Sequence, residues 1–176
     1  MIPAAKRPCS RYRADGLELE HMIRSRSRLW LWQVSEPRLD HELGDFLKSN
    51  LTEEELAYIR PSVTGHLDAN REYQVLRAYI NLQIPGQHGD WHRDSEQEGD
   101  RTILVYPSMT LTPEPEAGTE FLDGWIEPYE ANTYIDFDST LTHRSLATWQ
   151  WKTYRYTVAI KLRPLTHTQT TVKTPL

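Results

Sequence analysis

The sequence contains a single cysteine, Cys9. One thiol cannot form an intrachain disulfide, and it cannot build a cluster of thiolate ligands around a metal. No apolar run is long enough to span a bilayer, and the basic start MIPAAKRPCSRYR lacks the apolar segment of a secretory signal. These absences lead us to expect a cytoplasmic protein that does not act at a membrane.

Basic residues are scarce outside the N-terminal segment. Residues 1–28 contain seven Lys or Arg against three Asp or Glu, a net charge of +4, and because the whole chain carries −5, the remainder carries −9. Binding to a nucleic-acid duplex requires a basic face. We therefore expect no nucleic-acid partner.

The 176 residues are enough for one domain with a sizeable core. We divide this domain into four parts. Residues 1–28 are expected to be a polar N-terminal extension and residues 29–72 a mostly helical buttress. Residues 73–163 are expected to form a β core, and residues 164–176 a flexible tail.

The helical segment has several local signals. LWLWQV over residues 29–34 is expected to be a strand, and Ser35 is a suitable N-cap for a following helix. In NLTEEELAYIRP, Thr52 and Glu55 predict a capping box, and Pro61 is expected to end that helix. The apolar positions of the first of these helices would be Leu39, Leu43, Phe46 and Leu47.

From Tyr73 onward, short runs rich in β-branched and aromatic residues alternate with Gly, Pro and Asp. Several short strands at this spacing are typical of a β-sandwich or barrel. The fold class predicted is mainly β with flanking helices, a double-stranded β-helix or distorted jelly roll of cupin-like form. The expected strands lie near 74–82, 91–94, 102–106, 119–122, 132–137 and 153–162.

The stretch QHGDWHRD contains the pattern His-x-Asp twice, as His88/Asp90 and as His92/Asp94. Alternate residues of a strand point to the same side, so either pair could direct an imidazole and a carboxylate at one metal ion. The first pair lies in a Gly- and Pro-rich stretch that favours a turn, whereas the second follows Trp91, a good strand former. We therefore favour His92 and Asp94, and we expect His88 in a loop near a cofactor or substrate.

A third ligand would have to come from another strand. His143 is the best candidate, because it ends IDFDSTLTH, a strand and short loop in the β region. Two His and one carboxylate would form the facial triad of non-heme Fe(II) oxygenases. On spacing alone, these three residues could equally be unrelated. The histidines at 21, 41, 66 and 167 are expected to be ordinary surface residues.

The stretch KTYRYTVAIKL places a charge on an otherwise apolar strand. Arg155 and Thr157 share one face, whereas Tyr156, Val158 and Ile160 share the other. An unpaired buried charge is very costly, so Arg155 requires an anion. Its planar fork suits a bidentate carboxylate, to which Thr157 could add a hydroxyl. That carboxylate could be a structural Asp or Glu, or it could be 2-oxoglutarate held near an iron.

Taken in order, these pieces resemble the catalytic core of the prolyl-hydroxylase-like Fe(II)/2-oxoglutarate oxygenases over residues 79–162. The matching pieces are WHRD, DRTILVY, AGTEF, IDFDSTLTHR and YRYTVAI. The resemblance implies that three residues bind Fe(II), namely His92, Asp94 and His143.

The resemblance also assigns the residues that bind 2-oxoglutarate. It implies that Arg155 anchors the C5 carboxylate and that Tyr106 hydrogen-bonds the same group. Thr157 stands in the place of the Ser or Thr that relatives have two residues after the anchor. Two departures leave the substrate class open: LQIPGQHGDWH lacks a tyrosine that many relatives have, and 117–118 is Ala-Gly where relatives often have Gly-Gly.

The reaction implied by the resemblance is a hydroxylation. Such an enzyme uses O2 and 2-oxoglutarate as cosubstrates, with ascorbate as a reductant, and releases succinate and CO2 while it hydroxylates an unactivated C–H bond. The carboxylate ligand Asp94 leaves no position for a halide, which favours hydroxylation over halogenation.

The substrate is expected to be a small molecule, such as an amino acid or a biosynthetic intermediate. VLRAYINLQ places Arg77, Tyr79 and Asn81 on one strand face, a polar stripe that would suit a zwitterion or would simply face solvent. His88 and Trp91 are further substrate candidates beside the metal ligand. Core packing is favoured over closure of a pocket for three other tryptophans, Trp125, Trp149 and Trp151.

Two other functions remain as alternatives. A protein or peptidyl prolyl hydroxylase would share the metal ligands but needs an open groove for an extended chain. A non-catalytic, metal-binding cupin-like module would have no need for an anion anchor such as Arg155.

Overall fold

The computed structural model describes residues 7–24, 47–109, 115–150 and 153–165. Residues 20–24 are helical, and helix α2 spans Glu53–Thr64. No helix among the described residues is long and apolar enough to cross a membrane. The strands are β1 (Cys9–Arg13), β2 (Leu47–Asn50), β3 (Tyr73–Gln83), β4 (Arg101–Tyr106), β5 (Thr119–Phe121), β6 (Ile126–Glu127), β7 (Thr133–Asp138), β8 (His143–Ser145) and β9 (Arg155–Pro164).

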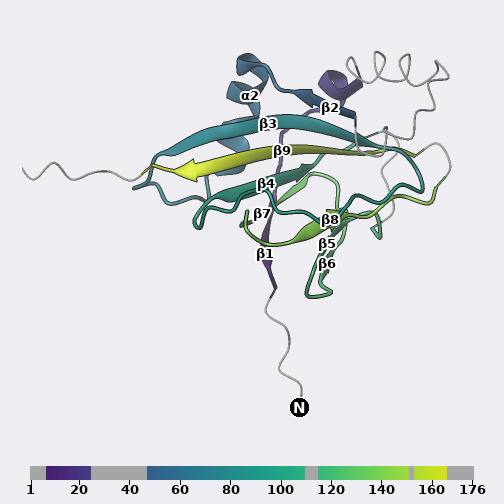
Figure 1. The fold of residues 1–176 in the computed structure, drawn as a ribbon. Coiled ribbons are helices and arrows are strands. Elements are labelled where there is room, and N and C mark those ends of the chain that lie inside the picture. The colour runs from purple at the N-terminus through teal and green to yellow at the C-terminus, as the bar shows by residue number, and fades with distance from the viewer. Residues whose placement is uncertain (1–6, 25–46, 110–114, 151–152, 166–176) are drawn as a thin grey trace, which may run out of the picture.

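The strands form two antiparallel sheets. The large sheet has the order β1-β7-β4-β9-β3-β2, and the small sheet has the order β6-β5-β8. Figure 1 shows helix α2 on one side of the large sheet and the small sheet on the other. This arrangement confirms the predicted fold class, because a mainly β chain folds into two facing sheets with few helices.

The alternation along β9 explains how the large sheet separates two cores. Tyr156, Val158 and Ile160 pack into the core on the helix side, together with Ile59 and Val63 of α2. Ala159 packs on the opposite side, into a second core that contains Phe121, Tyr129 and Phe137. Since β9 is buried along most of its length on both faces, its polar residues must find partners inside the protein.

Helix α2 confirms one end signal and contradicts the other. The Glu55 amide donates to Thr52 Oγ1 at 3.2 Å and the Thr52 amide donates to Glu55 Oε2 at 2.7 Å, so the predicted capping box is present. The prediction that Pro61 ends the helix is wrong, because the helix continues to Thr64. Proline is unfavourable inside a helix but has a helical φ, and the buried residues Ile59 and Val63 on either side of it pack the helix on the sheet.

Other differences concern the strands. Leu47, expected in a helix, begins β2 instead, whereas the strand expected over 29–34 and most of the helix after Ser35 lie outside the described residues. The strand expected over 91–94 is reduced to one isolated bridge between His92 and His143. Four short strands were not predicted: β1, β2, β6 and β8. Strand β1 lies within the predicted N-terminal extension and pairs with β7.

Candidate metal and dicarboxylate site

A cavity lies between the two sheets, and both sheets contribute to its wall. Most of the residues that line the cavity have polar side chains, and three are apolar: Leu104, Phe137 and Ala159. The other described residues that line the cavity are Tyr79, Asn81, His92, Asp94, Thr102, Thr119, His143, Ser145, Arg155, Thr157 and Lys161.

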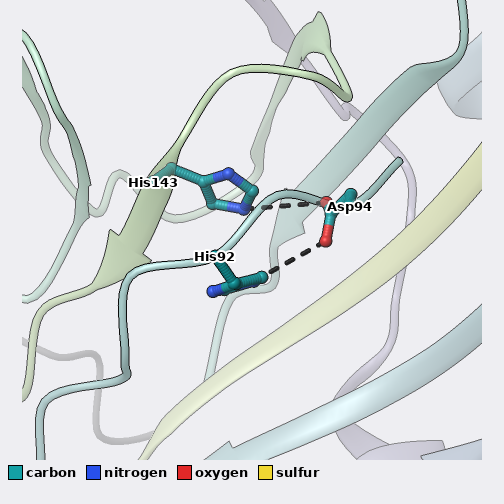
Figure 2. A group of neighbouring side chains, drawn as sticks. All are labelled: His92, Asp94 and His143. Atoms are coloured by element: carbon teal, nitrogen blue, oxygen red, sulfur yellow. Dashed lines mark ion pairs between the residues drawn. The ribbon is translucent and has the colours of Figure 1, made fainter. Parts of the chain in front are cut away.

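Three of these residues converge on one point. His92, Asp94 and His143 each offer a ligand atom, and these atoms lie within 4.8 Å of one another. The carboxylate is central: its Oδ1 lies 3.6 Å from His92 Nε2, and its Oδ2 lies 3.6 Å from His143 Nε2. Figure 2 shows the side chains pointing toward one another, with dashed lines from Asp94 to each imidazole. Two imidazoles and one carboxylate in this arrangement could hold one divalent metal ion.

Backbone pairing brings the two histidines together. The amide of each donates to the carbonyl of the other at 3.0 Å, which is the isolated bridge. The Nδ1 atoms lie near carbonyl oxygens, 2.8 Å from Asp90 O for His92 and 2.9 Å from Leu141 O for His143. These contacts place the ring proton on Nδ1, so that Nε2 is the unprotonated ring nitrogen, the one able to bind a metal. Burial also lowers the pKa of His143 to about 4, which keeps this imidazole neutral.

Asp94 is buried and held on both oxygens. Its side chain is 4% exposed. Thr102 Oγ1 donates to Oδ2 at 2.7 Å, and the ammonium of Lys161 forms an ion pair with Oδ1. The sequence reasoning missed Lys161, although the strand period places it on the same face as Arg155. The two-residue period of the strand therefore predicts that Lys161 faces the cavity.

The competing pair, His88 and Asp90, does not join this group. His88 is exposed in the loop after β3, where its Nδ1 accepts a hydrogen bond from the Ala147 amide at 3.1 Å. Asp90 is exposed, and it contributes its backbone carbonyl to His92 rather than a carboxylate to the cavity. The structure therefore brings together the favoured residues and leaves the other pair in a loop.

Arg155 lies elsewhere on the same wall and is 2% exposed. Its Nε donates to Ala117 O at 2.9 Å, and its Nη2 donates to Gly118 O at 3.1 Å and to Thr119 Oγ1 at 3.2 Å. Among the described residues, no Asp or Glu forms an ion pair with it. The structural carboxylate considered above as its partner is therefore missing from this part of the chain. A buried guanidinium on a cavity wall favours an anionic ligand.

The carbonyls of Ala117 and Gly118 and the hydroxyl of Thr119 form a cradle around the Arg155 guanidinium. Gly118 makes this cradle possible. A Cβ atom on Gly118 would lie 2.0 Å from the carbonyl oxygen of Glu127, far inside contact distance. Only a residue without a side chain lets this backbone approach Glu127 so closely. The Gly118 carbonyl then reaches Arg155 and also accepts from the Leu146 amide at 3.0 Å.

Of the two other residues predicted to bind 2-oxoglutarate, one lines the cavity and the other is buried behind its wall. Thr157 lines the cavity, with its Oγ1 3.4 Å from Asn81 Nδ2. Tyr106 is fully buried behind Thr119, to whose Oγ1 its hydroxyl donates at 2.9 Å. Burial raises the pKa of Tyr106 to about 12, so its hydroxyl remains a donor.

The predicted polar stripe of β3 faces the cavity side of the sheet. The β3–β9 register pairs Arg77, Tyr79 and Asn81 with Lys161, Ala159 and Thr157. Tyr79 and Asn81 line the cavity, whereas Arg77 is exposed at the outer end with its Cζ 4.6 Å from the Tyr79 ring centroid. Two buried polar atoms on the wall, Asn81 Oδ1 and Ser145 Oγ, have no hydrogen-bond partner within the described part of the chain.

The remaining aromatic predictions have mixed outcomes. Trp91 is 40% exposed and packs against Arg144 rather than lining the cavity. Core packing is wrong for Trp149, which is 70% exposed and whose ring meets that of His88 edge-on, with 5.6 Å between the ring centroids. Trp125 does pack partly against the core, and Trp151 lies outside the described residues.

Of the four histidines expected at the surface, His21 is exposed and two lie outside the described residues, at 41 and 167. The prediction is wrong for His66. Its side chain is 10% exposed, and Nε2 lies 2.9 Å from Asp136 Oδ2. The ring also contacts Tyr12, at 4.2 Å between ring centroids. This aromatic and acidic surrounding, on the helix side of the large sheet, accounts for its burial.

Comparisons with known proteins bear on the fold. The sequence matches no protein-family model. No curated protein matches it either. Among solved structures, the viral collagen prolyl hydroxylase vCPH from Paramecium Bursaria Chlorella virus-1, in its 2OG complex, matches 91% of this chain and 97% of its own, with a TM-score of 0.63 and 14% identity.

Two further structures are similar over most of their length. A prolyl-4-hydroxylase from Pseudomonas putida matches 90% of this chain and 94% of its own, with a TM-score of 0.56 and 14% identity. HygX from Streptomyces hygroscopicus, solved with nickel and 2-oxoglutarate bound, matches 89% of this chain and 82% of its own, with a TM-score of 0.56 and 10% identity. At these identities it is the fold that is shared: the chain has the double-stranded β-helix fold of the prolyl hydroxylases and other 2-oxoglutarate oxygenases.

Proposed function

We propose that this chain is an Fe(II)/2-oxoglutarate-dependent dioxygenase that hydroxylates an unactivated C–H bond of a small molecule, such as an amino acid. One observation carries the proposal. A His-Asp-His group and a buried guanidinium without a carboxylate partner among the described residues line the same cavity. The first is a ligand set for ferrous iron, and the second suits the far carboxylate of a dicarboxylic acid.

The residues present fit a bound iron. Both histidines direct Nε2 toward Asp94, and their Nδ1 atoms are engaged by backbone carbonyls, so no ring has to rotate to bind a metal. Three protein ligands leave positions open for a cosubstrate and O2. When bound, Fe(II) would supply the activation of O2 that is coupled to decarboxylation of 2-oxoglutarate to succinate and CO2.

The protein's own part would be to bind and orient. Arg155 would pair with the C5 carboxylate of 2-oxoglutarate through its fork, and Thr157 would add a hydroxyl beside it. Tyr106 would act indirectly, because its hydroxyl holds Thr119 in place next to Arg155. The apolar part of the wall would limit water around the reacting groups.

The substrate would use the polar atoms that remain unpaired. Asn81 Oδ1 and Ser145 Oγ are buried on the cavity wall and could bind N–H or O–H groups. Tyr79 would form the adjacent wall, and Arg77, at the exposed end of the stripe, would pair with an acidic group. A small zwitterion offers both kinds of group.

A peptidyl prolyl substrate is the second candidate, and one observation favours it. Trp149 is largely exposed on a segment that begins beside the cavity at Ser145 and bonds to the loop of His88. An exposed aromatic residue close to the cavity could support a chain longer than a free amino acid.

The test is succinate release from 2-oxoglutarate by purified protein with Fe(II) and ascorbate. Free amino acids and short proline-containing peptides would be screened in parallel. We expect slow uncoupled turnover without substrate and faster turnover with an amino acid. Faster turnover only with peptides would favour the second candidate. No turnover in any mixture, together with no 2-oxoglutarate-dependent visible absorption band of the anaerobic Fe(II) protein, would leave only the metal-binding module.

A further inference from the structure

Lys161 is a buried cation in contact with the carboxylate of the metal site. It is 9% exposed, and its Nζ forms an ion pair with Asp94 Oδ1. Its neighbour across the sheet is Thr102 of β4, whose hydroxyl donates to the other carboxylate oxygen. Asp94 is thus held between two adjacent strands, with a positive charge on one oxygen and a neutral donor on the other.

The formal charge of the cavity is unusual for a metal site. Among the described residues that line it, the charged ones are Asp94, Lys161 and Arg155, which gives +1 with neutral histidines. A divalent metal would raise this to +3. The side chains of Lys161 and Asp94 are only 11% and 4% exposed, so water screens this positive charge weakly and it repels a cation. The protein alone therefore offers a divalent cation a correctly shaped but positively charged site.

A dianionic cosubstrate would reverse this balance. 2-Oxoglutarate carries two carboxylates, so its binding with the metal would bring the charge of the cavity from +3 to +1. The same lysine that opposes binding of the metal alone would attract the dianion. Binding of the two ligands then becomes mutually dependent, and this coupling is reciprocal by thermodynamic linkage.

On the basis of the proposed function, we propose that Lys161 is a positioning residue. Its charge would make retention of the metal depend on bound 2-oxoglutarate. The ammonium holds Asp94 in place and weakens its hold on a metal that binds without the cosubstrate. If Lys161 only orients the carboxylate, its removal should have the opposite effect on metal binding. In that case its removal would weaken metal binding equally with and without 2-oxoglutarate.

The test is a titration of metal-free protein with Mn(II), followed by the electron paramagnetic resonance signal of free Mn(II), with and without saturating 2-oxoglutarate. Lys161→Met removes the charge and keeps the length of the side chain. Lys161→Gln is a second variant, and circular dichroism checks that each is folded. Arg163→Met is the matched control, because it removes a positive charge from the same strand, where Arg163 pairs with Asp100 outside the cavity.

In the wild-type protein and in Arg163→Met, 2-oxoglutarate should tighten Mn(II) binding. In Lys161→Met, Mn(II) alone should bind about tenfold more tightly than in the wild type, since one repelling charge is gone, and 2-oxoglutarate should tighten it by a smaller factor. Equal or weaker Mn(II) binding by Lys161→Met, with an unchanged effect of 2-oxoglutarate, would overturn the inference and leave the proposed function intact. A wild-type protein that binds no Mn(II) would overturn both.

Discussion

Arg155 donates from Nη2 to the carbonyl oxygen of Gly118 across 3.1 Å. Within the described residues, the guanidinium is therefore held by two backbone carbonyls and by the side-chain oxygens of Thr119 and Gln83, and by no carboxylate. Carbonyl oxygens satisfy its N–H donors without neutralising its charge. This relationship is what makes Arg155 suitable for a ligand: it is fixed in orientation, buried and still positively charged.

The geometry of this cradle predicts that Arg155 cannot be replaced by another cation. Arg155→Lys keeps the charge but loses the planar fork and the contacts to both carbonyls. We expect the apparent KM for 2-oxoglutarate to rise about tenfold or more, since at least one charge-assisted hydrogen bond is lost. The measurement is the rate of succinate release against 2-oxoglutarate concentration. Arg163→Lys is the control on the same strand, and an unchanged KM in Arg155→Lys would show that any positive charge at this position is enough and that the planar guanidinium is not required.

Gly118 should tolerate no side chain. The added methyl of Gly118→Ala would meet the backbone carbonyl of Glu127 at 2.0 Å, and a shift of Gly118 to relieve this clash would also move the carbonyl that accepts from Arg155. We expect a loss of about 1–3 kcal/mol in the free energy of unfolding, the usual cost of overpacking, together with weaker 2-oxoglutarate binding. Urea unfolding and calorimetry measure the two effects.

Gly65→Ala is the control for that experiment. Gly65 lies at the end of α2 in a right-handed conformation, and the nearest atom to an added Cβ is 4.0 Å away. Its substitution should change stability by no more than about 0.5 kcal/mol. Equal stability of Gly118→Ala and Gly65→Ala would show that the backbone around Gly118 adapts easily.

The two His-x-Asp pairs can be separated by parallel substitution. His92→Ala removes an Nε2 that lies 3.6 Å from Asp94, whereas His88→Ala removes a side chain that accepts from the Ala147 amide outside the cavity. We expect His92→Ala to abolish succinate release and His88→Ala to retain at least part of it. Bound iron per protein, measured after gel filtration, should follow the same order. Equal loss of iron from both variants would mean that the choice between the pairs was wrong.

The parts of this fold that follow from local patterns could be predicted from the sequence. The alternation of KTYRYTVAIKL placed Arg155 and Thr157 on one face and the apolar residues on the other, because the strand period is fixed by geometry. The Thr52–Glu55 capping box is equally local. The choice of His92 and Asp94 rested on a strand over 91–94, whereas the structure has only the bridge between His92 and His143 there, a contact distant in sequence.

The parts that depend on contacts distant in sequence could not be predicted. Strand β1 has the polar sequence CSRYR, and it pairs with β7, where its Arg11 also forms an ion pair with the buried Glu127 of β6. His66 follows a glycine and was expected at the surface, yet it is buried against Asp136, seventy positions away. The contact between Lys161 and Asp94 likewise requires knowledge of which strands are neighbours.

Acid should destabilise the metal-free protein through His143. Burial lowers the pKa of this imidazole from 6.5 to about 4. Between these values the unfolded chain binds a proton that the folded protein does not, so the free energy of unfolding falls as the pH decreases from 6.5 to 4. At pH 5 this group alone should cost about 2 kcal/mol relative to pH 7, by the linkage between pKa and stability.

His143→Phe isolates this contribution. A phenyl ring does not titrate, and the site already has aromatic neighbours, with the Phe137 ring centroid 4.8 Å from that of His143. Urea unfolding at pH 7 and pH 5 in the presence of a chelator should show a smaller loss of stability for His143→Phe than for the wild type. His21→Phe, which changes an exposed histidine, should behave like the wild type. If His143→Phe loses as much stability as the wild type between these pH values, the acid sensitivity arises elsewhere and the imidazole of His143 is not held neutral by burial.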